Sequence, residues 1–228
     1  MKEKANVKNM LSIGRNMKIG SNVAIFNISA IRSCPNCSSC ASTCYAFDTE
    51  CYRKNVKEFR KRNWDISKTD LFVPEMIRQI VKSKKKIVRI HESGDFYDPS
   101  YIFKWSQIIS ALPKVKFFGF TKVEDALVLN VFKNCNIIYS FITCGDEEIR
   151  NYGKEDFCKK LAEVSDTAIC PHDKTWKKKG KKCMIDCKKC LRAKRMIFVI
   201  HGNKKKKDKY ADQRMAVINA LNIKCKAI

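Results

Sequence analysis

Four cysteines within eleven residues near the amino terminus carry the strongest chemical signal of this sequence. They form the run Cys34-Pro-Asn-Cys37-Ser-Ser-Cys40-Ala-Ser-Thr-Cys44. Thiolates bind soft metals, and short spacings between cysteines let several sulfurs surround one centre. Four cysteines suit tetrahedral zinc as well as a four-iron cluster, but a zinc ribbon normally repeats a CxxC pair about fifteen to twenty residues later. No such pair follows here, so the spacing favours a 4Fe-4S cluster.

A second group of cysteines lies near the other end of the chain. Cys170 precedes a lysine-rich stretch that ends in Cys183-Met-Ile-Asp-Cys187-Lys-Lys-Cys190. Four ligands close a metal site, so we expect these cysteines to fasten a basic insertion, residues 171–195, onto the rest of the chain. Two metals remain open: a second 4Fe-4S cluster, or zinc, because short zinc modules also present basic side chains to nucleic acid.

The charge of the chain predicts a polyanionic partner. The formal net charge is +24, and residues 171–210 contain sixteen Lys and Arg against three Asp. Such a concentration favours a face that binds nucleic acid or a nucleotide, although scattered lysines are often only a solvated surface. No stretch approaches the roughly eighteen apolar residues needed to cross a membrane. Thirteen cysteines without an export signal fit a reducing compartment, so we expect a cytoplasmic protein.

The segment His91-Glu-Ser-Gly-Asp-Phe-Tyr-Asp98 is the second candidate for chemistry. It follows a predicted strand, and acidic side chains at the end of a buried strand have no packing reason to be there. We therefore expect Glu92 and Asp95 to meet a ligand and Gly94 to allow a close approach of the backbone. His91 and Asp95 are candidates for acid–base catalysis. Asp98 is expected only to cap the following helix.

The elements that position these residues alternate between strands and helices. Ile87–His91 is a short run of apolar and β-branched residues, typical of a strand buried on both faces of a parallel sheet. We predict one α/β domain over residues 1–228, with a six-stranded parallel sheet curled into a partial (β/α) barrel; a doubly wound sheet is the alternative. Strands are expected at 23–29, 87–91, 117–121, 137–142, 167–170 and 197–201, and helices at about 48–62, 72–84, 98–112, 124–132, 157–164 and 209–221.

The motifs together resemble a phage and mobile-element family, the gene product 88 family. That family has a CP…C…CYA loop, an RxHxSGDF segment, and a late cysteine group before an apolar strand ending in His-Gly. These correspond here to Cys34-Pro35, Cys40 and Cys44-Tyr45-Ala46; to Arg89, His91 and Ser93 to Phe96; and to His201-Gly202. The resemblance runs from about Val23 to Gly202. The cysteine loop after the first strand also resembles the cluster loop of radical S-adenosylmethionine enzymes.

The resemblance to radical enzymes implies roles for individual residues. It implies a catalytic cluster on Cys34, Cys40 and Cys44, with one iron open to S-adenosylmethionine, and an auxiliary cluster on the late cysteines. Ser93, Gly94 and Asp95 would meet the amino group of the methionine moiety. The loop departs from the usual CxxxCxxC spacing, and a fourth ligand, Cys37, would leave no open iron and make the cluster structural.

Two functions from different classes follow. The first is an enzyme that cleaves S-adenosylmethionine reductively and acts on a nucleic acid or nucleotide. The second is a non-catalytic nucleic-acid-binding protein that is held together by metal, iron–sulfur or zinc, at both cysteine groups.

Overall fold

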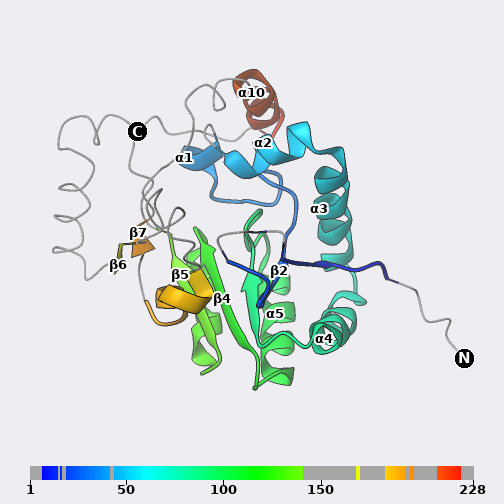
Figure 1. The fold of residues 1–228 in the computed structure, drawn as a ribbon. Helices are drawn as coiled ribbons and strands as arrows, with labels where there is room; N and C mark the ends of the chain where they lie inside the picture. Colours follow the sequence, from blue (N-terminus) through cyan, green and yellow to red (C-terminus); the bar gives the residue numbers. More distant parts are fainter. Residues whose placement is uncertain are drawn as a thin grey trace, which may run out of the picture.

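The computed structural model describes residues 7–14, 16, 19–41, 44–140, 168–169, 183–193, 196–197 and 210–221. Its centre is a five-stranded open sheet in the order β1-β2-β3-β4-β5 (Figure 1). The strands are β1 Leu11–Ile13, β2 Val23–Phe26, β3 Ile87–Ile90, β4 Lys116–Thr121 and β5 Cys135–Tyr139. β1 runs antiparallel to β2, and every later neighbour is parallel.

Helices cover one face of this sheet. Between β2 and β3 the chain forms α1 (Ser38–Ala41), α2 (Tyr45–Tyr52), α3 (Lys54–Ser67) and α4 (Phe72–Ser83). Then α5 (Pro99–Ala111) and the 3₁₀ helix η1 (Glu124–Val131) connect the remaining strands. Because strands β2 to β5 follow one another in space as in sequence, right-handed crossovers place their connections on the same face. The core of this face contains Phe26, Ile90 and Phe117 from the sheet and Phe72, Met76 and Trp105 from the helices.

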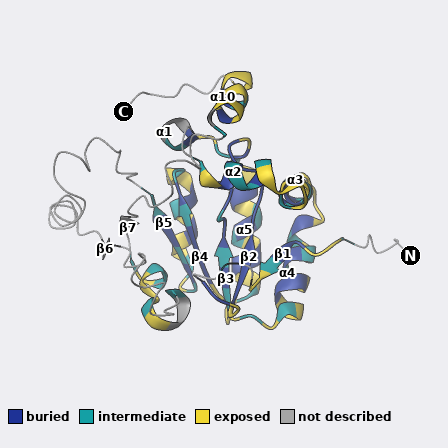
Figure 2. Ribbon diagram, turned by 45° about the horizontal axis from the view of Figure 1, so that its top comes forward, coloured by how far each residue is buried: buried dark blue, intermediate teal, exposed yellow. Residues whose placement is uncertain are grey.

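The opposite face of the sheet is covered by the late cysteine segment. Residues 183–193 form a π-helix, η2 (Cys183–Cys187), and a 3₁₀ turn, η3 (Lys189–Leu191). Cys183, Cys190 and Leu191 pack against a cluster that includes Ile25 and Phe118. The Asn136 amide of β5 donates to the carbonyl oxygens of Cys190 and Ala193, each at 3.0 Å. Figure 1 shows this segment beside β4 and β5, and Figure 2 shows the buried strands between it and α5.

The predicted six-stranded parallel sheet is confirmed only for its first four strands. The short antiparallel β1 was not predicted, because three residues carry too little pattern to mark a strand. β6 (Ala168–Ile169) and β7 (Met196–Ile197) pair with each other in a separate two-stranded sheet, so within the described residues they do not extend the main sheet or close a barrel. The predicted helix 157–164, the strand ends 141–142, 167, 170 and 198–201, and the first residue of the predicted helix 209–221 lie outside the described residues.

Most helix predictions are confirmed, with two changes. α5 begins as expected, since the Asp98 carboxylate accepts a hydrogen bond from the Ser100 N–H at 2.7 Å and Pro99 occupies the first turn. The predicted helix 48–62 is interrupted at Arg53, whose non-helical backbone, with φ −130° and ψ 88°, separates α2 from α3. The predicted helix 124–132 is a 3₁₀ helix, in which Asn130 exchanges two side-chain hydrogen bonds with the main chain of Ile137. The last described helix is α10, Ala211–Ala220.

Candidate functional site

The early cysteine loop lies at the carboxyl edge of the parallel strands, as the sequence predicts. It leaves the end of β2, forms α1, and enters α2 at Cys44. Cys37 is buried, Cys34, Cys40 and Cys44 are half-buried, and all four pack in one cluster with Ile31 and other apolar residues. Main-chain hydrogen bonds from Cys34 to Ile31 and from Cys44 to Ala41 fold the loop back on itself. The four thiols therefore belong to one apolar cluster, for which we use the name cysteine pocket.

The thiols of the cysteine pocket influence one another's ionisation. Burial is the main cause that raises the pKa of Cys34 well above its usual value; nearby Asp95 and the other three thiols raise it further. Burial also raises the pKa of Cys44 to about 11, against the lowering effect of the N–H groups of Phe47 and Ala46 at the start of α2. Cys34 and Cys44 are consequently protonated at neutral pH, and a nearby cation would favour their thiolates.

The chemistry of the pocket fits a thiolate-bound metal, although no metal geometry is preformed. Four sulfur donors from one loop are the ligand set of an iron–sulfur cluster or of structural zinc. In the described ranges, however, no three His, Cys, Asp or Glu side chains are already arranged to hold a metal ion. Ligand binding there would have to draw the sulfurs together.

The turn after β3 fastens the cysteine loop to the sheet. His91, at a positive φ of 62°, bends the chain out of β3, and Gly94 follows at 83°. The Ser93 hydroxyl donates to the Ile28 carbonyl oxygen at 2.9 Å, and the Asp95 N–H donates to the Ser33 carbonyl oxygen at 3.1 Å. A Cβ on Gly94 would lie 2.3 Å from Ile28 Cγ1 and 2.5 Å from Ser33 Oγ. Gly94 thus permits the contact between this turn and the loop.

Asp95 is used as a clamp between β3 and β4. Its carboxylate accepts hydrogen bonds from the Phe96 N–H at 2.8 Å, the Thr121 hydroxyl at 2.6 Å and the Lys122 N–H at 2.9 Å. Desolvation raises the pKa of this carboxyl, while those hydrogen bonds act in the opposite direction. The predicted ligand-binding roles of Ser93 and Asp95 therefore compete with structural contacts that already occupy both side chains.

Glu92, in contrast, directs its carboxylate toward Arg89, at the carboxyl end of β3 and on the sheet face opposite the helices. Arg89 lies on that face, with its guanidinium 5.5 Å from the centre of the Phe120 ring. Arg89 Nη1 donates to Glu92 Oε1 at 3.2 Å, and the Asn16 amide also bonds this oxygen. The exposed Tyr45, next to Cys44, donates its hydroxyl to the Glu92 carbonyl oxygen at 3.2 Å. We call these four residues, Asn16, Tyr45, Arg89 and Glu92, the polar mouth.

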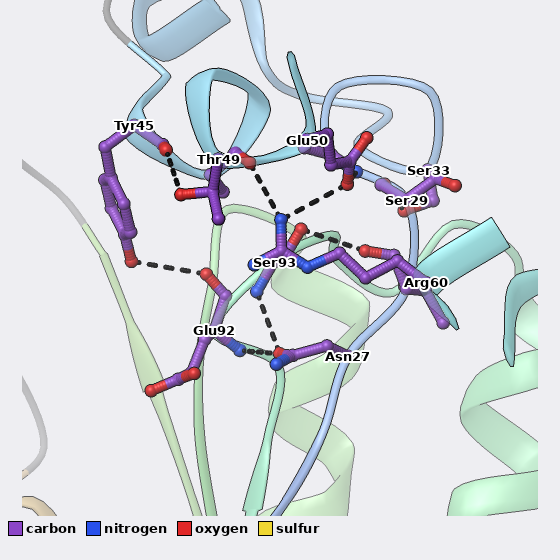
Figure 3. A network of polar contacts seen from close by, with 12 residues as sticks. Asn27, Ser29, Ser33, Tyr45, Thr49, Glu50, Arg60, Glu92 and Ser93 are labelled. Atoms are coloured by element: carbon purple, nitrogen blue, oxygen red, sulfur yellow. Dashed lines mark hydrogen bonds and ion pairs between the residues drawn. The ribbon is translucent and has the colours of Figure 1, made fainter. Parts of the chain in front are cut away.

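A buried network connects the polar mouth to the helices behind the cysteine pocket (Figure 3). The Asn27 side-chain oxygen accepts the N–H groups of Glu92 and Ser93, at 2.6 Å and 3.1 Å. Glu50 accepts the Ala30 N–H at 2.8 Å and forms an ion pair of 3.3 Å with Arg60. The sequence analysis did not identify Asn27, Glu50 or Arg60. Asn27 had a signal, since it is a polar residue inside the apolar run Val23–Ser29, but its partners lie about 65 positions away. Glu50 and Arg60 lie among other charged residues, so nothing in the pattern marked them as buried.

The helix α10 packs over the cysteine pocket from the far end of the chain. Ile218 joins the same cluster as the four cysteines. Arg214 forms a short ion pair with Asp48 of α2, and Tyr210 stacks on Tyr52 with ring centres 6.2 Å apart. Figure 1 shows α10 above α2. A helix that was predicted only as a terminal element thus forms part of the wall of the pocket.

His91, a predicted catalytic residue, lies in the aromatic core on the helix side of the sheet. Its Nε2 is 2.8 Å from the Tyr101 hydroxyl, and Phe26, Phe96 and Trp105 surround the ring. Burial, followed by the charge of Arg89, lowers its pKa to about 3. This position favours a packing role, so we do not retain His91 among the residues of the candidate site.

The buried His91 predicts a loss of stability in mild acid. In the unfolded chain His91 is protonated near the ordinary histidine pKa, whereas in the folded chain its pKa is about 3 and it stays neutral until the pH falls near that value. The stabilisation is therefore complete above the unfolded value and is lost as pH falls below it. Between about pH 7 and about pH 5, we expect about 2 kcal/mol less free energy of unfolding from this group. Urea titrations of His91→Gln should show a shallower pH dependence; an unchanged slope would contradict the assignment.

The late cysteines are not part of the cysteine pocket. Cys183 and Cys190 lie in the cluster on the opposite sheet face, with Cys187 half-buried in the same segment. Cys170, the fourth predicted ligand, is outside the described residues. The two predicted cysteine groups therefore lie at two separate places in the fold.

None of the described helices has the length and apolar character that crossing a membrane requires.

Comparison with known proteins agrees with the motif pattern of the loop and the turn. The family model described as gene product 88 matches residues 2–220. The gene 88 proteins of Mycobacterium phages L5 and D29 are 35% and 36% identical over 108 residues, which is 42% of this chain and 45% of each relative. The aligned part thus spans less than half the length of these relatives. No solved structure matches. Since the family model covers nearly the whole sequence, the chain belongs to the gene product 88 family.

Proposed function

We propose that the cysteine pocket holds a 4Fe-4S cluster and that the chain is a radical S-adenosylmethionine-type enzyme. The observation that carries the proposal is the presence of four thiols in one apolar cluster beside the carboxyl edge of a parallel sheet. In open α/β sheets, ligands bind at this edge. When bound, such a cluster supplies the electron for reductive cleavage of S-adenosylmethionine.

The cysteines divide into three ligands and one spare thiol in this proposal. Cys34, Cys40 and Cys44 are half-buried in the cluster, whereas Cys37 is 2% exposed. The Sγ atoms of Cys37 and Cys40 make similar contacts, at 3.8 and 3.7 Å, with the carbonyl oxygens of Ile31 and Cys37, so burial is what distinguishes Cys37. That placement supports Cys37 as the residue that stays off the metal, which leaves one iron open. Full ligation by all four thiols would instead make the cluster structural.

The polar mouth is suited to the methionine end of S-adenosylmethionine. Glu92 offers a carboxylate to an ammonium group, and Arg89 offers a guanidinium to a carboxylate. The two groups already form a pair, so a zwitterion would exchange one internal contact for two external ones. Gly94 and the clamp residues Ser93 and Asp95 serve by holding the loop and the polar mouth in place.

The late cysteines are assigned to a second metal that fastens the segment 183–193 to the sheet. Iron–sulfur and zinc both fit a set of Cys170, Cys183, Cys187 and Cys190. The exposed Lys188, Lys189 and Arg192 lie between and beside these cysteines. Their positions support nucleic acid or a nucleotide as the substrate, and equally support the second candidate function, a metal-stapled nucleic-acid-binding protein without catalysis.

Anaerobic purification separates these functions. We expect iron and acid-labile sulfide in the protein, and 5′-deoxyadenosine from S-adenosylmethionine after reduction. Glu92→Gln should weaken S-adenosylmethionine binding by about tenfold or more, because a charge-assisted hydrogen bond is lost, without changing the iron content.

The matched control is Glu75→Gln. Glu75 also pairs with an arginine three residues away, Arg78, but on the exposed side of α4. We expect this variant to bind S-adenosylmethionine normally. Iron without any binding of S-adenosylmethionine would select the non-catalytic function, and zinc without iron would refute the cluster itself.

A further inference from the structure

The amino edge of the parallel sheet, opposite the cysteine pocket, carries a concentration of lysines. Three successive loops meet there: the one between α4 and β3, the one between α5 and β4, and the one between η1 and β5. Six exposed lysines and one half-buried lysine lie on or beside these loops: Lys82, Lys84, Lys85, Lys86, Lys114, Lys116 and Lys133. We call them the lysine edge. The stretches 81–87, 111–116 and 131–136 contain no acidic residue.

The positive charge of the lysine edge is larger than the neutralisation of the nearby helix C-termini would require. In a parallel β/α arrangement the helices end at this edge, and each helix C-terminus carries about −0.5 of an elementary charge. Three such ends amount to about −1.5, against seven lysines. None of the seven forms an ion pair with a described residue. Helix α3, which also carries several exposed lysines, differs in this respect, since Lys61 there pairs with Asp65 at 2.7 Å.

The loops of the lysine edge are tied to one another. The Lys116 N–H donates to the Lys86 carbonyl oxygen at 2.9 Å, which joins the first loop to the second. The Asn134 amide donates to the carbonyl oxygens of Ile109, Leu112 and Val115, at 3.2, 3.1 and 3.0 Å, which joins the third loop to the second. The backbones that carry the charges are thus held in fixed relative positions, so binding an anion requires little ordering of the chain.

We propose that the lysine edge binds the phosphate backbone of double-stranded nucleic acid without reading its sequence. Adjacent strands are about 4.8 Å apart, so the loops of β3, β4 and β5 span about 10 Å, a length over which a duplex carries about six charges. Lysines act on phosphates as point charges and lack the bidentate base recognition of arginine. No exposed aromatic side chain lies on these loops to stack an unpaired base, which favours a duplex over a single strand.

The proposed function includes a nucleic-acid partner, and the lysine edge gives that partner a binding surface separate from the cysteine pocket. β4 has six residues, so its two ends are separated by about 16 to 20 Å. A duplex held at the amino edge is therefore anchored away from the cysteine pocket. Binding there requires no metal, and it does not depend on whether the pocket holds a cluster.

One lysine from each loop tests the inference. The triple variant Lys86→Gln, Lys116→Gln and Lys133→Gln is compared with Lys54→Gln, Lys57→Gln and Lys61→Gln on α3, which removes the same charge. Binding of a labelled duplex of about 20 base pairs is followed by anisotropy between about 50 and 200 mM KCl. For the edge variant, we expect the slope of log affinity against log salt to fall by about 2 to 3, with about tenfold or greater loss of affinity. We expect the α3 variant to stay within about twofold of the parent protein.

Three results would overturn the inference: equal losses in both variants, no loss in the edge variant, or binding to phosphatidylglycerol vesicles with none to the duplex. Iron is measured in the same preparations. A selective loss of duplex binding in protein without iron would uphold the lysine edge while refuting the proposed cluster. If the protein contains iron and both triple variants lose duplex binding equally, the cluster would be upheld and the lysine edge refuted.

Discussion

Replacing Gly94 with alanine is expected to lower the free energy of unfolding by about 3 to 5 kcal/mol. Two costs combine at this position. The backbone has a φ of +83°, which an L-residue with a side chain rarely adopts, and the new Cβ would lie 2.3 Å from Ile28 Cγ1. The second cost is the larger, because Ile28 and Ser33 are both buried and the Ser93 hydroxyl already holds the chain here. Chemical denaturation followed by tryptophan fluorescence measures the loss.

Gly14 provides the control for Gly94. It has a similar φ of +73°, but the nearest atom to a built Cβ is Ser21 Cβ at 3.7 Å, an ordinary contact. Gly14→Ala should therefore cost only the conformational part, about 1 to 2 kcal/mol. Losses of equal size in the two variants would mean that the loop moves away from the turn, and that the close approach at Gly94 does not position the cysteine pocket.

Replacing Cys44 with alanine is expected to remove essentially all iron from the anaerobically purified protein. The binding free energy of a thiolate-bound structural metal is on the order of 10 kcal/mol or more at neutral pH, and it depends on a complete ligand set. Cys44 enters α2 beside the polar mouth, and its sulfur lies near the N–H groups of Ala46 and Phe47. Iron and sulfide assays, with the absorption spectrum of the anaerobic protein, measure the effect.

Cys135 provides the matched control for Cys44. It lies in β5 in the core of the helix face, and burial raises its pKa to about 12, so it has no tendency to form a thiolate. Cys135→Ala should keep its iron and lose only about 1 to 2 kcal/mol of stability through the cavity that it leaves. Cys37→Ala should also retain iron if Cys37 is the spare thiol. Equal iron in the Cys44 and Cys135 variants would rule out the cysteine pocket as the cluster site.

For the turn after β3, the sequence predicted the position of the segment but not the contacts of its side chains. The sequence identified 91–95 as a special segment at the end of a strand, and that position is confirmed. It did not reveal that the Ser93 hydroxyl bonds Ile28, or that the Asp95 carboxylate accepts hydrogen bonds from the main chain after β3 and from the end of β4. It also did not reveal that, of the acidic residues in this turn, Glu92 is the one that belongs to the polar mouth. A carboxylate in a motif has the same appearance in sequence whether it meets a ligand or two neighbouring strands.

The sequence by itself determined the local elements of this protein. Short apolar runs predicted β3, β4 and β5, Asp98 and Pro99 predicted the start of α5, and cysteine spacing predicted one compact loop after β2. These features depend on residues within a few positions of one another, and their physical causes, burial, capping and short loop closure, act over that range.

Only the tertiary structure decided which residues face the pocket. Asn27 bonds Ser93 across 66 positions, and Arg214 pairs with Asp48 across 166. The antiparallel β1, the core position of His91 and the covering of one sheet face by the late cysteines likewise depend on packing between distant segments. Such contacts arise when the strands assemble and bury their faces, and local propensity carries no record of that partner choice because the free energy that selects it comes from burial and hydrogen bonding between segments far apart in the chain.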